Sequence, residues 1–178
     1  MLIAAIDPGR EGVLAHLDCP LDAHPGALGV PFGWSPLPVV TGSGLVEGDL
    51  ARSLAALRPG LLVIERAQAF PKMGVVSAFN YGADWGKLLG IAGALSIPVV
   101  TVRSDVWHRA VVGAHKRSPG ETKEQARIDA KARAYLHVRR TLPLIDLPGA
   151  RKWREPVVEA LCMILYGRAQ LAKRSEVA

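Results

Sequence analysis

Two acidic residues stand where expected strands end. Asp7 follows the apolar run 2–6, and Glu65 closes the apolar run 61–65. Short apolar runs bounded by turn residues are typical of buried strands. Because open α/β sheets keep their sites at the carboxyl ends of strands, we expect Asp7 and Glu65 to converge at one edge of a sheet.

A second acidic pair lies near the end of the chain. Glu155 and Glu159 are four residues apart, so on a helix they share one face. Four carboxylates at one place would repel each other unless a cation lay between them. Oxygen ligands without His or Cys suit Mg²⁺ or Mn²⁺, and two such ions can activate a water and stabilise the leaving oxygen of a phosphodiester. The combination predicts a metal site, although each signal alone is also typical of a turn or a helix start.

Positive charge is concentrated in one stretch. The chain has a net charge of +6, and residues 103–154 hold thirteen Lys and Arg against five Asp and Glu. Such a stretch indicates a polyanionic partner, either nucleic acid or an anionic membrane surface, while a solvated basic surface is the plain alternative. The predicted phosphate contacts are Arg103, Arg109, Lys116, Arg117, Arg127 and Lys131.

The elements that position these residues form an α/β pattern. We expect an antiparallel hairpin first, then strands alternating with helices that cover the faces of a mixed sheet. Residues 18–44, rich in Pro and Gly, are predicted to be a long excursion, and Pro156 is placed in the first turn of the last helix. The expected strands are 2–6, 12–17, 37–41, 61–65 and 97–102, and the expected helices are 47–57, 75–95, 107–112, 122–138 and 155–171.

Four glycines follow one ridge of the expected helix 75–95. Each mid-helix glycine costs about 1 kcal/mol relative to alanine, so another backbone is expected to pack closely there. The ridge packs either on the protein's own sheet or on the same helix of a second copy. The glycines are Gly82, Gly86, Gly90 and Gly93.

Other classes find no support in the sequence. The 178 residues predict one domain, 1–178, and no uncharged segment reads as a membrane-spanning helix. The first residues lack the pattern of a signal peptide, so we expect a cytoplasmic protein. Cys19 and Cys162 do not form a zinc motif, and neither a phosphate-binding loop, a dinucleotide fingerprint nor a nucleophile elbow is present, so no nucleotide cofactor is expected.

Five motifs, spread over nearly the whole chain apart from residues 18–60, resemble one family. They are residues 6–9 (IDPG), 64–71 (IERAQAFP), 79–82 (FNYG), 155–161 (EPVVEAL) and 166–167 (YG). In these motifs the chain resembles the RuvC-like Holliday junction resolvases, most closely their phage-type members. The resemblance implies a ribonuclease-H-like fold, a homodimer, and Mg²⁺-dependent nicking of two symmetry-related strands of a four-way DNA junction in a bacterial or phage-infected cell.

By position, the resemblance makes Asp7 and Glu65 the first two catalytic carboxylates and Glu155 with Glu159 the closing pair. The family's closing pair is usually rich in Asp, whereas both members here are Glu, and we expect Glu159 to be the better metal ligand of the two. The resemblance also implies a basic residue near His108 and Arg109, and a lysine at a helix start. Lys123 matches that lysine, and it is expected to contact the scissile phosphate or to assist proton transfer.

The loop after Glu65 carries an aromatic and a basic residue, Phe70 and Lys72. An exposed Phe70 would stack on an unpaired base at the junction centre, an interaction of about 1–3 kcal/mol per base. The alternative is a core phenylalanine that closes the loop.

The sequence therefore favours a metal-dependent endonuclease that resolves four-way junctions by paired nicks. Two other hypotheses stay open. One is a ribonuclease-H-like nuclease that acts on other branched DNA or on RNA–DNA hybrids. The other is a junction-binding protein whose active site has decayed.

Overall fold

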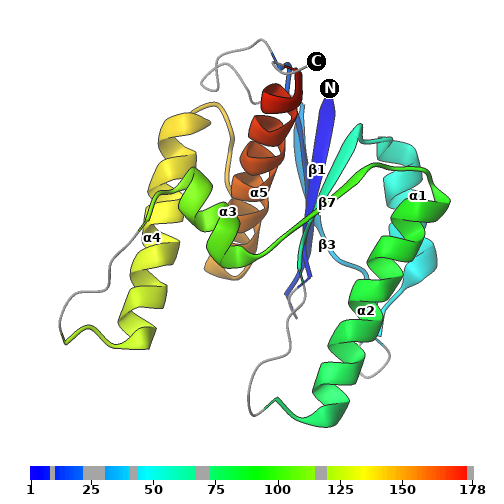
Figure 1. Cartoon of the computed structure of the whole chain (residues 1–178), viewed down its shortest axis with the longest axis horizontal. Helices are drawn as coiled ribbons and strands as arrows, with labels where there is room; N and C mark the ends of the chain where they lie inside the picture. The colour runs from blue at the N-terminus through cyan, green and yellow to red at the C-terminus, as the bar shows by residue number, and fades with distance from the viewer. Residues whose placement is uncertain (9–10, 22–30, 41–43, 67–72, 115–119, 176–178) are drawn as a thin grey trace.

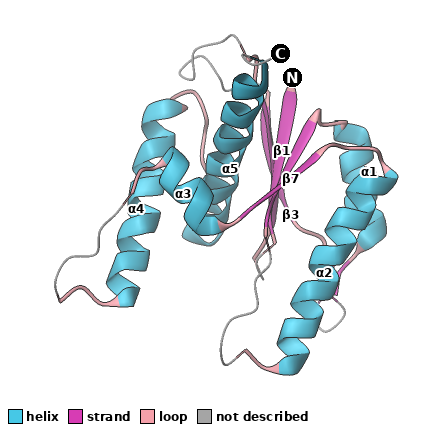
Figure 2. Ribbon diagram, viewed as in Figure 1, coloured by secondary structure: helices cyan, strands magenta, loops and turns pink. Residues whose placement is uncertain are grey.

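The computed structural model describes residues 1–8, 11–21, 31–40, 44–66, 73–114 and 120–175. In this structure a five-stranded sheet lies between two layers of helices (Figure 1, Figure 2). The α/β class predicted from the sequence is confirmed.

The central sheet is mixed, as expected. Its first three strands form an antiparallel meander, and its last two run parallel to the first strand. In spatial order they are β3 (Phe32–Pro36), β2 (Val13–Asp18), β1 (Leu2–Asp7), β6 (Leu61–Glu65) and β7 (Val99–Val102). A separate ribbon pairs β4 (Val39–Val40) with β5 (Gly44–Leu45).

The helices divide between the two faces of the sheet (Figure 1). One face carries α1 (Glu47–Leu57) and α2 (Val75–Ala94). The opposite face carries α3 (Ser104–Val111), α4 (Lys123–Thr141) and α5 (Arg151–Ser175). Within the described residues, no helix is both long and apolar enough to cross a membrane.

Each face of the sheet has its own apolar core, because side chains on a strand alternate between the two faces. On β1, Ile3 and Ala5 pack in the core under α5, whereas Ala4 and Ile6 pack in the core under α1 and α2. Strand β6 alternates in the same register, since Ile6 of β1 pairs with Ile64 of β6. Sheet position therefore determines which helical layer each side chain meets.

The bounds of several elements differ from the sequence predictions; α3, for example, begins at Ser104 rather than at 107, and α4 ends at Thr141 rather than at 138. Two further differences change the description of the sheet edge and of the last helix. The expected strand 37–41 contains only the short β4, and the strand that completes the sheet edge is β3, five residues earlier. The last helix begins at Arg151 rather than Glu155, so Pro156 lies inside α5 and not in its first turn. This start could not be predicted from the sequence, because residues 151–154 are mostly basic and lack the repeated apolar spacing that is typical of a helix.

The glycine ridge of α2 does not pack on the sheet. A Cβ added at Gly82, Gly86, Gly90 or Gly93 would meet no heavy atom within 4 Å among the described residues. The prediction that these glycines pack closely on the protein's own sheet is wrong. The alternative interpretation of the ridge is a contact with a second copy.

A different glycine marks the close approach of helix to sheet. A Cβ at Gly167 of α5 would lie 2.6 Å from Cγ2 of Val63 and 3.0 Å from Cδ2 of Leu61. Only a residue without a side chain fits there. Gly167 thus lets the end of α5 lie against β6 and helps to fix the rest of the helix over the sheet.

Candidate active site

The two strand-end carboxylates lie side by side on the face covered by α5. Ile6 pairs with Ile64 across the parallel β1 and β6, so the next residues, Asp7 and Glu65, are neighbours. Both positions continue the alternation that points toward α5. Burial and the charge of Asp7 together raise the pKa of Glu65. The convergence expected from the sequence is therefore present.

Glu159 projects from α5 toward this pair. It is a half-buried carboxyl, and this burial, together with the charge of Asp7, raises its pKa to about 7, against the opposite effect of Lys131. The charges of Glu65 and Glu155 add to the upward shift. The three elements β1, β6 and α5 thus bring together carboxylates that disfavour each other's ionisation.

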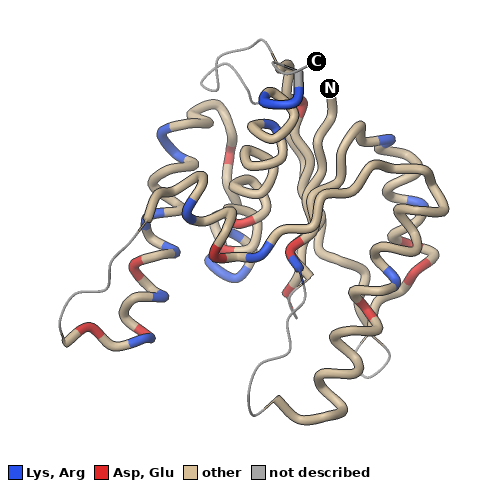
Figure 3. The backbone as a smooth tube through the Cα atoms, in the orientation of Figure 1, with Lys and Arg blue, Asp and Glu red and all other residues tan. Residues whose placement is uncertain are grey.

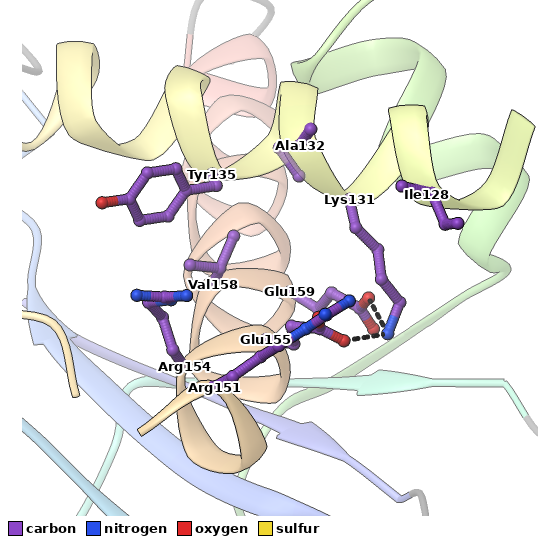
Figure 4. Close-up of a pocket in the computed structure, with 10 residues that line it drawn as sticks. Ile128, Lys131, Ala132, Tyr135, Arg151, Arg154, Glu155, Val158 and Glu159 are labelled. Carbon is purple, nitrogen blue, oxygen red and sulfur yellow. Dashed lines mark hydrogen bonds and ion pairs between the residues drawn. The ribbon is translucent and has the colours of Figure 1, made fainter. Parts of the chain in front are cut away.

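Glu155 sits in a different electrostatic setting, one turn before Glu159. Its two oxygens are held by two cations: Lys131 Nζ lies 2.7 Å from Oε2, and Arg151 Nε donates to Oε1 at 2.6 Å (Figure 4). Hydrogen bonds from Lys131 and then Arg151 lower the pKa of Glu155. The two glutamates of the pair therefore differ, and Glu159 is the one that shares charge with Asp7 and Glu65.

A tryptophan fixes the orientation of Glu65. Trp107 of α3 is 2% exposed, and its indole Nε1 donates a hydrogen bond to Glu65 Oε2 at 3.1 Å. The two residues are 42 positions apart, so no local pattern in the sequence could have indicated the contact. The charges of the site also affect Tyr81 of α2: burial and the charges of Glu65 and Asp7 raise the pKa of its hydroxyl.

Open hollows surround the carboxylates. One of about 380 Å³ is bordered by Asp7, Glu11, Glu155 and Glu159 together with the basic start of α5. Another of about 390 Å³ is bordered by Glu65, Trp107, Arg127 and Glu159. Lys131 and Glu159 border both. A charged, elongated ligand can therefore reach the carboxylates from two sides.

The donor set fits a hard divalent cation in its chemistry. All the acidic groups offer carboxylate oxygens, which Mg²⁺ and Mn²⁺ prefer. Among the described residues, however, no three His, Cys, Asp or Glu side chains are already grouped closely enough to hold a metal ion. An ion bound by Asp7, Glu65 and Glu159 would require these side chains to turn toward one another.

The predicted DNA contacts fall into three groups. Arg103, just before α3, and Arg127, on α4, are exposed and form ion pairs with the nearby carboxylates Asp105 and Glu124. Arg109 is exposed on α3, and His108 Nε2 lies 3.2 Å from the carbonyl oxygen of Ala130. Figure 3 shows basic positions recurring along α4. Four predicted residues lie outside the described part of the chain: Phe70, Lys72, Lys116 and Arg117.

Two lysines of α4 occupy different places from those expected. Lys123 is exposed at the first position of α4 and borders neither of the two hollows at the carboxylates. Lys131, expected only as a phosphate contact, lies at the carboxylates instead. The sequence interpretation missed Arg151 and Lys152, which border the site from the start of α5. The four-residue spacing of Arg151 and Glu155 was a signal that could have indicated the first of them.

Comparison with solved structures identifies the fold. The structure of Thermus thermophilus RuvC superposes with a TM-score of 0.62 at 19% identity, over 96% of this chain and 97% of that one. T. thermophilus RuvC in complex with a Holliday junction substrate gives the same score and identity, over 95% and 96%. Fowlpox virus resolvase, in complex with its substrate Holliday junction DNA, gives 0.59 at 13% identity, over 96% and 99%. No family model and no curated protein sequence matches the chain.

Proposed function

We propose that the chain is a divalent-metal-dependent endonuclease that resolves four-way DNA junctions by paired symmetric nicks. Its fold supports this proposal, because it is the ribonuclease-H-like fold of the RuvC and fowlpox virus resolvases over nearly its full length. In this proposal residues 1–178 form one nuclease domain. The observation that carries it is the convergence of Asp7, Glu65 and Glu159 on one edge of the sheet, among open hollows with basic borders.

In the proposed reaction, the residues of the site divide into metal ligands, a support for one ligand, and phosphate contacts. Asp7, Glu65 and Glu159 would hold the metal, and Trp107 would keep Glu65 oriented. When bound, divalent ions supply an activated water and stabilise the leaving oxygen of a phosphodiester. Hydrolysis of the bond between phosphorus and the 3′ oxygen would consume one water and leave a 5′-phosphate and a 3′-hydroxyl. Basic residues of α3, α4 and α5 would hold the phosphates without reading the base sequence.

Two symmetric nicks need two active sites related by a two-fold axis, so we propose a homodimer. The exposed face of α2 fits this role because it is lined by small and apolar residues. Its charged residues point elsewhere: Asp84 Oδ1 accepts a hydrogen bond from the amide of Leu45, and Lys87 pairs with Glu47. The exposed residues of this face include Val75, Val76, Phe79, Gly82, Gly86, Gly90 and Gly93.

The dimer has a direct test. Gly86→Arg should leave the fold of each chain intact, because nothing in the described structure lies within 4 Å of a Cβ at that position. We expect the variant to run as a monomer in light scattering and to lose the pairing of its nicks. A wild-type protein that is monomeric at working concentration and still makes paired nicks would contradict the dimer.

Two observations favour a second candidate, a junction-binding protein without cleavage. Glu155 is held by Lys131 and Arg151, and the described acidic residues form no ready-made metal cluster. Under this alternative the protein binds a four-way junction tightly and cuts it in no divalent metal.

One experiment separates these functions. A labelled synthetic four-way junction and a linear duplex of the same sequence are incubated with the protein in Mg²⁺, in Mn²⁺ and in chelator. Paired, metal-dependent nicks confined to the junction would support resolution. Binding without nicks would favour the second candidate. Cutting of other branched DNA or of an RNA–DNA hybrid, in preference to the junction, would assign a different substrate to the same site.

A further inference from the structure

Lys131 stands at the centre of the acidic site rather than on its rim. It borders both hollows described above and a third of about 190 Å³, which is also lined by Ile128, Tyr135 and Val158. Glu159 borders the same three hollows. Its Nζ lies 2.7 Å from Oε2 of Glu155 and 3.7 Å from Oε1 of Glu159 (Figure 4). The ammonium group therefore sits against the oxygens of both glutamates that α5 contributes.

The contact joins two helices, unlike the ion pair that Arg127 forms on α4. Arg127 binds Glu124 one turn away on the same helix, whereas Lys131 reaches across to α5. Lys123 lies eight residues earlier, which is about 12 Å along the helix axis. Lys123 is the lysine that the sequence predicts at the site, but Lys131 is the lysine that reaches the carboxylates.

A single positive charge among several carboxylates does what a bound cation would do. It offsets the repulsion between Glu155 and Glu159 and holds their side chains in place. The ammonium group of Lys131 also contacts the glutamate oxygens that a metal ion would need as ligands. Arg151 holds the other oxygen of Glu155, so Glu155 remains part of this cationic arrangement.

Resting on the proposed function, we propose that Lys131 is the built-in counter-cation of the carboxylate site, which a divalent metal must displace from Glu159 in order to bind. Lys131 is thus a positioning residue. It keeps the metal-free site folded and sets the metal concentration at which the site fills. Glu155 serves to hold this lysine and is not the ligand that its place in the sequence suggests.

The test compares metal binding and stability in Lys131→Met, which keeps most of the aliphatic stem and removes the charge. Binding of Mn²⁺ alone is measured at pH 8 from the signal of the free ion in electron paramagnetic resonance. We expect Lys131→Met to bind Mn²⁺ about tenfold more tightly than the wild type, because the site loses a competing unit charge. Without metal its Tm should fall below that of the wild type, and saturating Mn²⁺ should narrow the difference.

The chain offers a closely matched control. Lys87 is 30% exposed against 32% for Lys131, and it also pairs with two carboxylates, Glu47 at 2.9 Å and Asp84 at 3.4 Å. Lys87→Met should leave Mn²⁺ affinity at the wild-type value, and its Tm difference from the wild type should not respond to Mn²⁺. Lys131→Arg, which keeps the charge, should bind Mn²⁺ like the wild type.

The outcomes are separable. Unchanged or weaker Mn²⁺ binding by Lys131→Met, with a wild type that binds, would overturn the role of Lys131 alone. Failure of every protein to bind Mn²⁺ would overturn the proposed metal dependence and this role with it. If Lys131→Met does not fold, Lys131→Gln provides the same comparison.

Discussion

The two helical layers over the sheet use similar residues for different purposes. Each layer has a half-buried lysine paired with two carboxylates, Lys87 beside α1 and Lys131 beside α5. Each also has a tryptophan whose indole nitrogen is buried. Trp107 donates to Glu65, whereas Trp85 Nε1 has no hydrogen-bond partner within the described structure.

The difference lies in the carboxylates. On the α1 and α2 side they are exposed or tied to a backbone amide, so their charges stabilise the chain. On the α5 side they are buried near one another, and burial together with the charge of Asp7 raises the pKa values of Glu65 and Glu159. Carboxylates with raised pKa values that lie near one another do not stabilise a fold, so their arrangement indicates a functional site.

The largest expected effect is a loss of junction cleavage that a substitution on α5 should cause and a matched substitution on α2 should not. Glu159→Gln should reduce cleavage of a four-way junction on the order of 10³-fold and leave junction binding intact, because a candidate metal ligand loses its charge. Asp84→Asn on α2 is the control and should cut normally. Single-turnover cleavage and a gel-shift titration give both quantities. Equal loss in the two variants would remove the distinction between the layers.

The second prediction concerns the stability of the metal-free protein. The pKa of Glu159 is raised from 4.5 to about 7, so between these pH values the folded protein holds a proton that the unfolded chain has lost. The free energy of unfolding should therefore fall as pH rises through this window, by up to about 3 kcal/mol. Urea unfolding in chelator at pH 5, 6, 7 and 8 measures the slope.

The same experiment has an internal comparison. Glu159→Gln should flatten the slope and be more stable than the wild type at pH 8. Glu124→Gln, which removes an exposed carboxylate, should retain the wild-type slope. A wild-type free energy of unfolding that is constant or rises over this pH range would contradict the prediction. It would show that ionisation of the Glu159 carboxyl does not destabilise the folded protein.

The third prediction compares the two tryptophans. Trp107→Phe keeps an aromatic ring in the core and removes the hydrogen bond to Glu65, so metal affinity should fall about 10- to 100-fold. Trp85→Phe removes an indole N–H without a partner in the described structure and should leave metal affinity unchanged. Mn²⁺ titration of both variants makes the comparison. Equal affinities would mean that Glu65 needs no positioning by Trp107.

The smallest effects are expected for two helix glycines. Gly167→Ala should destabilise the protein by about 1–3 kcal/mol, because its methyl group would lie 2.6 Å from Val63. Gly90→Ala should stabilise an isolated chain by up to about 1 kcal/mol, because alanine favours helix and nothing described lies near. Thermal unfolding distinguishes them. Loss of stability in Gly90→Ala would indicate that α2 packs on another surface in solution.

Much of the fold could be predicted because its signals are local. Apolar runs that end at turn residues located β1 and β6, and leucine spacing gave α1 with its observed bounds, Glu47–Leu57. The edge strand β3 was missed because it is half exposed and lies in a Pro- and Gly-rich segment without alternation. The start of α5 was missed because its first turn is polar.

The candidate site divides in the same way. The sequence by itself determined that Asp7 and Glu65 end buried strands and that Glu155 and Glu159 share a helix face, since spacing and periodicity are properties of the local chain. Only the tertiary structure decided that Glu159 joins the strand-end carboxylates while Glu155 is held by Lys131, and that Trp107 supports Glu65. These contacts join residues 24 to 152 positions apart, and their partners are chosen by the packing of α3, α4 and α5 on the sheet. No local pattern encodes that choice, because it depends on distances between elements that are set only when the core closes.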